Sequence, residues 1–229
     1  MKKALFGLVL VFLTISNINA HAKSYKGIQK IDMEVFRNDK LIGYSNYLFT
    51  HKKNTLEVKN ITQFKVKLFN IVIFSISSEA LEKYKNDKLI SYNSITFQND
   101  KEKYVKLEYD KLNDNFIIDG SSFKGIAESD IIIGNWWNHK ILKADKQISP
   151  ISGSIKEQLI EFVGKENIKI YDKNYLLDHY KLMSKNKELP EDKKLDFDIW
   201  FNPENNLIFK VSYNKKGEWE YRLKSFEIN

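Results

Sequence analysis

The sequence of 229 residues contains no cysteine, and this absence removes several classes of protein from consideration. Without a thiol there is no disulfide scaffold, thiol nucleophile, cysteine-ligated zinc or iron–sulfur cluster, and no lipid anchor on an amino-terminal cysteine. Proline and glycine are scarce, with 3 and 9 residues, so the chain is neither a linker nor a fibrous repeat. Hydrophobic residues make up 42% of the chain and aromatic residues 14%, which argues for a folded core and against disorder.

Arginine is nearly absent as well, since Arg37 and Arg222 are the only two among 37 lysine and arginine residues. The formal net charge is +7. Proteins that read nucleic acids rely on arginine, whose planar guanidinium binds phosphates and guanine through paired hydrogen bonds. The lysines here are scattered along the chain and do not cluster. We therefore expect a solvated, lysine-rich surface and no nucleic-acid partner.

Motifs for catalysis and for cofactors are also missing. After the first 22 residues the histidines are His51, His139 and His179, and none of them lies in a metal-ligand spacing. The sequence has no phosphate-binding loop, no dinucleotide-binding motif and no serine nucleophile elbow. We therefore predict no metal and no cofactor, and we expect a protein that is not an enzyme.

One pair of carboxylates keeps an enzymatic alternative open. Asp196 and Asp198 share a strand face with Trp200, and paired carboxylates beside an aromatic ring suit a sugar site or a cation site. Two acids on a solvent-facing surface are more often simply solvated. In the same way, His139 beside Trp137 could be a general base, but a buried, hydrogen-bonded histidine is the more common situation.

The first 22 residues have the pattern of a cleavable signal peptide. Lys2 and Lys3 precede an apolar run over residues 4–15, and the segment ends in the small-x-small sequence Ala20-His21-Ala22. The apolar run is too short to span a bilayer, which takes about 20 residues. We predict a signal peptide over residues 1–22 and an exported mature chain without a transmembrane segment. In a Gram-negative cell this means the periplasm.

From residue 23 onward, apolar and polar residues alternate over much of the chain. Residues 56–58, 64–68, 195–201 and 219–224 show the period of two that half-buried strands require. Turn sequences rich in Asn and Asp separate these runs, at intervals of about 10–14 residues. We predict one mainly β domain over residues 23–229, built as an antiparallel meander.

One hairpin can be assigned a register from the sequence. We assume a tight turn over Asn214–Gly217 with Gly217 in the left-handed conformation. The facing pairs are then Asn214–Glu218, Tyr213–Trp219, Val211–Tyr221 and Phe209–Leu223. Each apolar residue meets another on the same face, whereas a slip of one residue would pair Val211 with Glu220.

Residues 129–140 interrupt the alternation. Ser129 or Asp130 could cap one or two helical turns, and the segment carries Ile131-Ile132-Ile133 and Trp136-Trp137. A short element this apolar is stable only when it inserts into a core or a groove. We predict a short helical plug or lid on one face of the sheet, which makes the fold a β-rich α+β fold. The two tryptophans seal the core, contact an apolar ligand, or do both.

Six short motifs, spread over residues 25–226, together resemble a family of exported bacterial proteins of unknown function. The motifs are Asn38-Asp-Lys-Leu-Ile-Gly43, Phe64-Lys-Val-Lys-Leu-Phe-Asn-Ile-Val-Ile-Phe74, Asn86-Asp-Lys-Leu89, Gly134-Asn-Trp-Trp-Asn138, Asp198-Ile-Trp-Phe201 and Glu220-Tyr-Arg-Leu223. That family is similar to the periplasmic lipoprotein carriers and receptors (LolA/LolB-like). The resemblance implies a strongly curved antiparallel sheet, an unclosed half-barrel with a hydrophobic concave face, on which Trp136-Trp137 belongs to the lid. It carries over no catalytic residue.

The leading hypothesis is an exported, non-enzymatic protein that binds or carries a lipid or acyl chain on the concave face of a curved sheet. The candidate lining residues are Phe64, Val66, Leu68, Phe74, Trp136, Trp137, Phe209, Tyr221 and Leu223. The same residues would form an ordinary closed core if the sheet wrapped tightly. The first alternative is a structural or interaction protein of the cell envelope that docks an envelope protein through its sheet edges. The second is a glycan-acting enzyme that uses Asp196 and Asp198.

Overall fold

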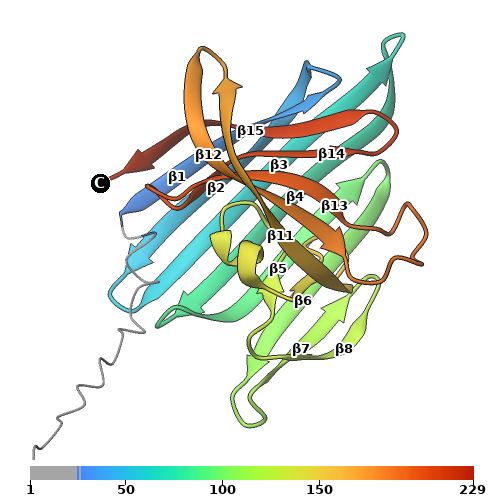
Figure 1. The fold of residues 1–229 in the computed structure, drawn as a ribbon. Coiled ribbons are helices and arrows are strands. Elements are labelled where there is room, and N and C mark those ends of the chain that lie inside the picture. Colours follow the sequence, from blue (N-terminus) through green and yellow to red (C-terminus); the bar gives the residue numbers. More distant parts are fainter. Residues whose placement is uncertain (1–24, 26) are drawn as a thin grey trace, which may run out of the picture.

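The computed structural model describes Tyr25 and residues 27–229, so the predicted signal peptide over residues 1–22 lies outside the described residues. In this part of the chain, 15 strands join one sheet in the order β8-β7-β6-β5-β4-β3-β2-β1-β15-β14-β13-β12-β11-β10-β9 (Figure 1). The strands are β1 (Ile28–Arg37), β2 (Lys40–Lys52), β3 (Thr55–Leu68), β4 (Ile71–Lys85), β5 (Lys88–Gln98), β6 (Lys101–Asp110), β7 (Asn115–Gly120), β8 (Lys124–Glu128), β9 (Ile132–Ile133), β10 (Lys146–Ile148), β11 (Ile155–Ile170), β12 (Lys173–Ser184), β13 (Asp196–Asn202), β14 (Leu207–Asn214) and β15 (Glu218–Ile228).

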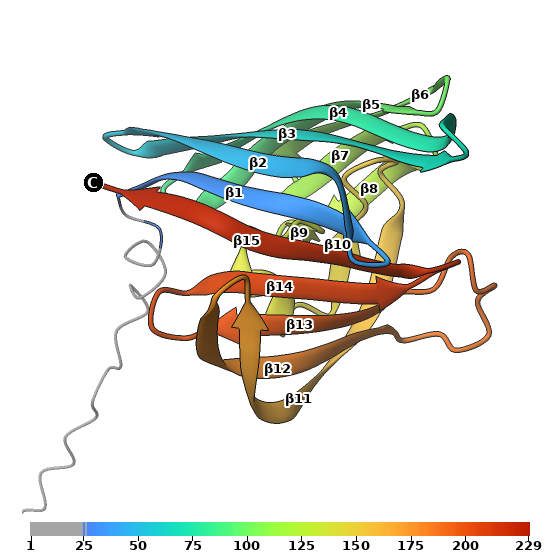
Figure 2. The same cartoon turned by 90° about the horizontal axis from the view of Figure 1, so that it is seen from above.

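The sheet curls so that its two halves face each other without closing into a full barrel (Figure 2). Strands β1 to β8 form one arm and β11 to β15 form the other, and the two arms join where β1 pairs with β15. Neighbouring strands are antiparallel, apart from the parallel pair of β9 and β10. The predicted fold, a large curved antiparallel sheet that forms an unclosed barrel, is confirmed.

Helix is limited, in the described part of the chain, to the 3-10 segment η1 (His139–Lys143). No helix among these residues is long and apolar enough to span a bilayer.

Tight turns form where Asn-Asp pairs predict them. At the β1–β2 turn Asn38 and Asp39 have φ values of 47° and 58°, and at the β4–β5 turn Asn86 and Asp87 have values of 49° and 63°. Two successive residues with positive φ make a turn whose twist matches that of the flanking strands. Asn and Asp tolerate this left-handed region because their short side chains bond the local backbone.

The hairpin of β14 and β15 has the predicted register over most of its length. Its pairs include Val211–Tyr221, Tyr213–Trp219 and Asn214–Glu218, and Gly217 has a φ of +123°. The fourth predicted pair, Phe209–Leu223, is absent from the ladder because the register between β13 and β14 shifts. Trp200 faces Lys210 while Phe201 faces Ile208. This β-bulge leaves Ile208 and Phe209 both buried, which a strict period of two does not predict.

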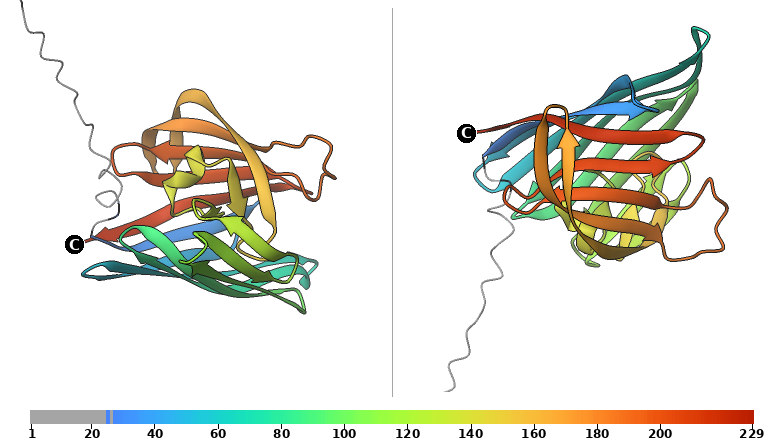
Figure 3. Two further views of the ribbon diagram at one scale, coloured as in Figure 1. Left: turned by 90° about the horizontal axis from the view of Figure 1, so that it is seen from below. Right: turned by 45° about the horizontal axis from the view of Figure 1, so that its top comes forward.

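The segment of residues 129–143, named the plug below, lies between the two arms of the sheet (the yellow segment in Figure 3). Its helical turn comes later than the sequence analysis expects. Asn138 is the N-cap of η1, and its side-chain oxygen accepts a hydrogen bond from the backbone N–H of Lys140 at 3.1 Å. In place of a helix capped by Ser129 or Asp130, Ile132 and Ile133 form β9, because β-branched side chains favour extended backbone.

Replacing Gly217 by valine will lower the free energy of unfolding by about 1 kcal/mol or more, because a β-branched residue is strained at positive φ. A Cβ at this position would also lie 3.0 Å from Oδ1 of Asn38. Urea unfolding followed by tryptophan fluorescence measures the change. The matched control is Lys215→Val in the same turn, where φ is not positive. Equal stability of the two variants would contradict the turn geometry.

Candidate functional site

A cavity of about 110 Å³ lies between the plug and the concave face of the sheet. Strands β2 to β5 form one wall, residues 133–136 and 150–151 form the other, and Tyr221 of β15 contributes from the second arm. Ligand pockets for small molecules usually begin at about 300 Å³. In this conformation the space directly beneath the plug is therefore nearly filled.

A buried carboxylate lies at the edge of this cavity and holds the plug to the sheet. Glu82 on β4 is only 2% exposed. Its Oε1 accepts hydrogen bonds from Nδ2 of Asn135 at 2.7 Å and from the indole Nε1 of Trp137 at 2.9 Å. Its Oε2 accepts a hydrogen bond from the hydroxyl of Tyr84 at 2.6 Å. Two of the three donors come from the plug, so Glu82 fixes the position of the plug on the sheet.

Burial raises the pKa of Glu82 to about 7, and the hydrogen bonds from Tyr84, Trp137 and Asn135 offset part of that effect. A carboxylate taken out of water loses its hydration, which favours the neutral acid. Donated hydrogen bonds favour the charged form. The balance places the titration of this anchor close to neutral pH.

The two tryptophans of the plug have different environments. Trp137 is 2% exposed, and its ring packs edge-on against Tyr25, Phe49 and Tyr84 at centroid distances of 5.1, 5.3 and 5.8 Å. Trp136 is half-buried. It lines the cavity, and its ring centroid is 5.1 Å from that of Phe197 and 6.2 Å from that of Tyr221. Trp137 is therefore a core residue, whereas Trp136 lies between the cavity and Phe197 of the second arm.

The cavity brings together only part of the predicted lining. Phe64, Trp136 and Tyr221 line it. Val66 and Phe74 pack with Phe64 in a separate cluster around Trp219, and Leu223 packs in the cluster of Trp137. Phe209 contacts the ring of Tyr175 at 4.9 Å. Leu68 lies outside the concave face, on the exposed end of the β3–β4 hairpin.

Polar residues that the sequence analysis did not select form one stretch of the cavity wall. Ser45 on β2 and Thr62 on β3 are joined by a hydrogen bond of 2.7 Å, and Nδ2 of Asn60 donates to Oγ of Ser45 at 3.2 Å. Glu82 was also missed, although Ala80, Glu82 and Tyr84 share the inward face of β4. An acid at an inward position of an alternating strand was the signal that could have found it.

The amino end of the plug's helical turn has a second polar anchor. The backbone N–H of His139 donates to the hydroxyl of Tyr25 at 2.7 Å, and that hydroxyl also contacts Nδ1 of the His139 ring. His139 is buried, so it is the hydrogen-bonded core histidine that the sequence favours over a general base.

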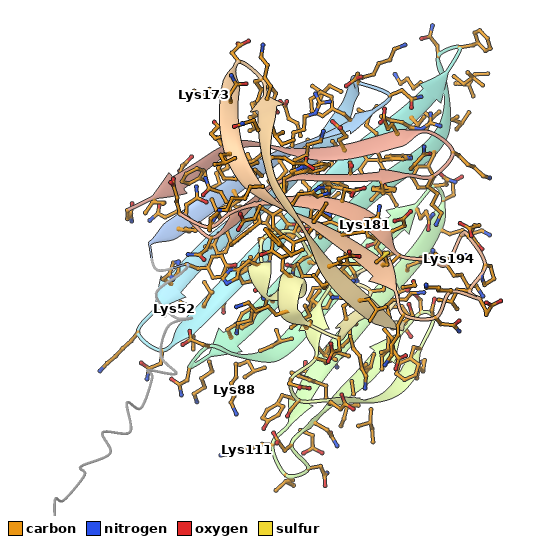
Figure 4. The ribbon with its side chains drawn as sticks, viewed as in Figure 1. Lys52, Lys88, Lys111, Lys173, Lys181 and Lys194 are labelled. Carbon is orange, nitrogen blue, oxygen red and sulfur yellow. The ribbon has the colours of Figure 1, made fainter. Side chains whose placement is uncertain are left out.

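Asp196 and Asp198 lie at the opposite face of the sheet from the plug, within an ion-pair network. Nζ of Lys181, labelled in Figure 4, is 2.8 Å from Asp196 and 2.9 Å from Asp198. Asp198 also contacts Nε2 of His179 at 2.8 Å, and the His179 ring stacks on Trp200 at 4.7 Å. Burial raises the pKa of Asp198, but the hydrogen bonds from Lys181 and His179 outweigh it and lower that pKa overall. Both carboxylates are ion-paired with Lys181, and Asp198 is not held protonated for general-acid work.

Among the described residues, no group of three or more histidine, aspartate or glutamate side chains is arranged to hold a metal ion.

The fold and the plugged concave face define a class of protein, a barrel-like antiparallel sheet with a covered interior. A solved structure with a similar fold is the β-barrel-like protein of the domain of unknown function DUF1849 from Brucella abortus. It aligns with a TM-score of 0.61 over 89% of this chain and 98% of its own, at 6% sequence identity. At that identity the likeness concerns the fold alone.

The particular family is given by the sequence itself. Residues 33–224 match the model of the domain of unknown function DUF6134, and the chain belongs to this family. The predicted membership of a family of unknown function is confirmed. A search of curated proteins finds no match.

Glu82 makes stability depend on pH in a defined direction. Its pKa is about 7 in the folded chain and 4.5 without the surrounding fold, so between these values the folded state holds a proton that the unfolded state has lost. Stability will therefore fall as pH rises from 4.5 to 7, by on the order of 3 kcal/mol from this group. Above pH 7 the contribution will be constant. Urea unfolding at a series of pH values measures it.

The control for this prediction is Glu82→Gln, which keeps the shape of the side chain but cannot titrate. We expect its stability to lack the decline between pH 4.5 and 7. If wild type and Glu82→Gln show the same slope over that range, Glu82 is not the group that titrates.

Proposed function

We propose that this chain is a non-enzymatic exported protein of the bacterial envelope that binds an apolar ligand, such as a lipid or acyl chain, on the concave face of its sheet. The observation that carries the proposal is the plug. A distinct segment covers the concave face, and a small cavity already lies beneath it. In the strand ladder the plug joins the sheet only through the two-residue pairing of β9 with β10, so it can move off the concave face without the long strands unfolding.

Ligand binding requires the plug to shift, because a cavity of about 110 Å³ is too small for an acyl chain. Trp136 is the residue best placed to move, since it is half-buried and lies between the cavity and Phe197 of the second arm. An aromatic side chain of this size covers about 150–250 Å² of surface. Its displacement would join the cavity to the apolar surface beside Phe197 and Tyr221.

The proposed localisation and the carrier role rest on the sequence. Residues 1–22 have the pattern of a signal peptide, which directs the chain to the periplasm in a Gram-negative cell. The resemblance to lipoprotein carriers agrees with an open half-barrel whose concave face is covered by a lid. In this proposal the plug is the lid, and the ligand takes its place against the sheet.

The two alternatives gain different support. The lowered pKa of Asp198, caused by its hydrogen bonds to Lys181 and His179, gives no support to Asp198 as the general acid of a glycan-acting enzyme. An interaction role in the envelope has its support in the exposed apolar end of the β3–β4 hairpin.

Native mass spectrometry will test the proposal, with organic extraction of the protein after purification from a bacterial envelope. We expect a reproducible mass increment that corresponds to a lipid or acyl species and that disappears after extraction. A homogeneous unliganded mass, with nothing apolar in the extract, would contradict ligand carriage.

Replacing Trp136 by alanine will increase binding of the fluorescent apolar probe N-phenyl-1-naphthylamine severalfold, because the removed indole adds room to the cavity beneath the plug. Titration of the probe by fluorescence measures the dissociation constant.

The control is Trp200→Ala, which removes the same type of side chain from a position that does not line the cavity and where Trp200 stacks on His179. We expect its probe affinity to equal that of wild type. A similar gain in both variants would point to nonspecific loosening of the fold instead of a site on the concave face.

A further inference from the structure

An exposed apolar end of the β3–β4 hairpin has no role in the site described above. The two strands run on together beyond their neighbours, because the pairing of β2 with β3 ends at Gly43–Phe64 and that of β4 with β5 ends at Ile76–Gln98. The hairpin projects from the sheet at the upper right of Figure 1. Its outermost part, residues 67–73, is called the β3–β4 tip below.

The β3–β4 tip is more apolar than an exposed turn normally is. Its exposed hydrophobic residues are Leu68, Phe69, Ile71, Val72 and Ile73. An exposed cluster of this kind marks a contact surface, since single exposed apolar residues are common but grouped ones are not. A projecting two-stranded hairpin is also only marginally stable in water without a surface to cover its apolar side.

Phe69 is the most unusual residue of the tip. It is 89% exposed, and its φ is +48°, followed by +66° at Asn70. The turns at Asn38-Asp39 and Asn86-Asp87 have the same geometry and use residues that tolerate it. A bulky aromatic residue is disfavoured at positive φ. Neither packing nor turn chemistry accounts for Phe69, so its role lies in what the tip contacts.

Charge around the tip points to an anionic partner. Residues 60–78 contain two basic residues, Lys65 and Lys67, and no acidic residue. The neighbouring turns at the same end of the sheet add four exposed lysines, Lys40, Lys101, Lys215 and Lys216. The acids among them are Asp39, which pairs with Arg222, together with Asp100, Glu102 and Glu218. The projecting part of the hairpin, residues 60–78, therefore carries only basic charges behind an apolar end.

We infer that the β3–β4 tip inserts into the headgroup region of a lipid bilayer that contains anionic lipid. Lys67 lies two residues behind Phe69, about 7 Å along the strand, which matches the depth of about 5–10 Å that apolar groups reach at a bilayer surface. Phe69 and its apolar neighbours then enter the acyl boundary while Lys65 and Lys67 meet the phosphates.

The size of the tip favours a bilayer over a protein partner. Seven residues at the end of a hairpin cannot supply the roughly 800 Å² that each side of a stable protein–protein interface buries. A bilayer needs no complementary shape, so a narrow projecting end is sufficient. The inference does not depend on ligand carriage, because the tip lies outside the concave face.

The absence of cysteine allows a direct test. Phe69→Cys carries a single thiol, which can be labelled with the environment-sensitive dye NBD in the full chain. Leu112→Cys is the matched control, because Leu112 is 95% exposed and lies next to Lys111, at the opposite end of the molecule in Figure 4. With vesicles of phosphatidylethanolamine and phosphatidylglycerol at 3:1, we expect NBD emission to shift to the blue and at least double at position 69. At position 112 it should stay unchanged.

Vesicle flotation provides the second readout. The triple variant Leu68→Ser, Phe69→Ser, Ile71→Ser should float at least tenfold less than wild type, whereas Leu112→Ser should equal wild type. Lys65→Gln with Lys67→Gln should remove the preference for phosphatidylglycerol over pure phosphatidylcholine. Any amino-terminal apolar segment is common to all these chains and cancels in the comparison. Equal flotation of the triple variant and wild type, or no dye response at position 69, would overturn the inference.

Discussion

The buried carboxylate of Glu82 is the interaction on which the covered state of the molecule depends. Asn135 and Trp137 bring their donors from the plug, and Tyr84 brings a third from the sheet. A charge in this position is costly unless donors surround it, and the donors in turn would be unpaired without an acceptor. The sheet and the plug therefore hold one another in a single arrangement, and an apolar residue at position 82 could not specify it.

Much of the fold followed from local rules. The Asn-Asp turns and the alternation of residues predict individual hairpins, and Val211–Tyr221 and Tyr213–Trp219 pair as expected. The departures come from β-bulges, such as the one between Val66 and Lys67. A bulge adds one residue to one strand and bends it, and it is not visible in a pattern that assumes a period of two. The pairing of Phe209 failed for this reason.

The site was less accessible to sequence reasoning because it is assembled from distant segments. The plug was recognised from its composition, and Trp137 is buried as its size suggests. The hydrogen-bond acceptor of Trp137 could not be identified from the sequence, because Glu82 lies 55 residues away along the chain. Leu68 shows a second limit of prediction from the sequence. Leu68 alternates in step with Phe64 and Val66 along β3. The β3–β4 hairpin extends beyond the neighbouring strands, however, so Leu68 is exposed to solvent. The alternation along a strand assigns each side chain to one face of the sheet. Only the lengths of the adjacent strands decide whether that face is covered.

The junction of the two arms has a consequence for biogenesis. β1, near the start of the described chain, pairs with β15, which ends at Ile228. This seam cannot form until the final strand has been synthesised, and such distant pairings form slowly because a long loop must first be closed. A topology of this kind delays the complete half-barrel until β15 has left the ribosome.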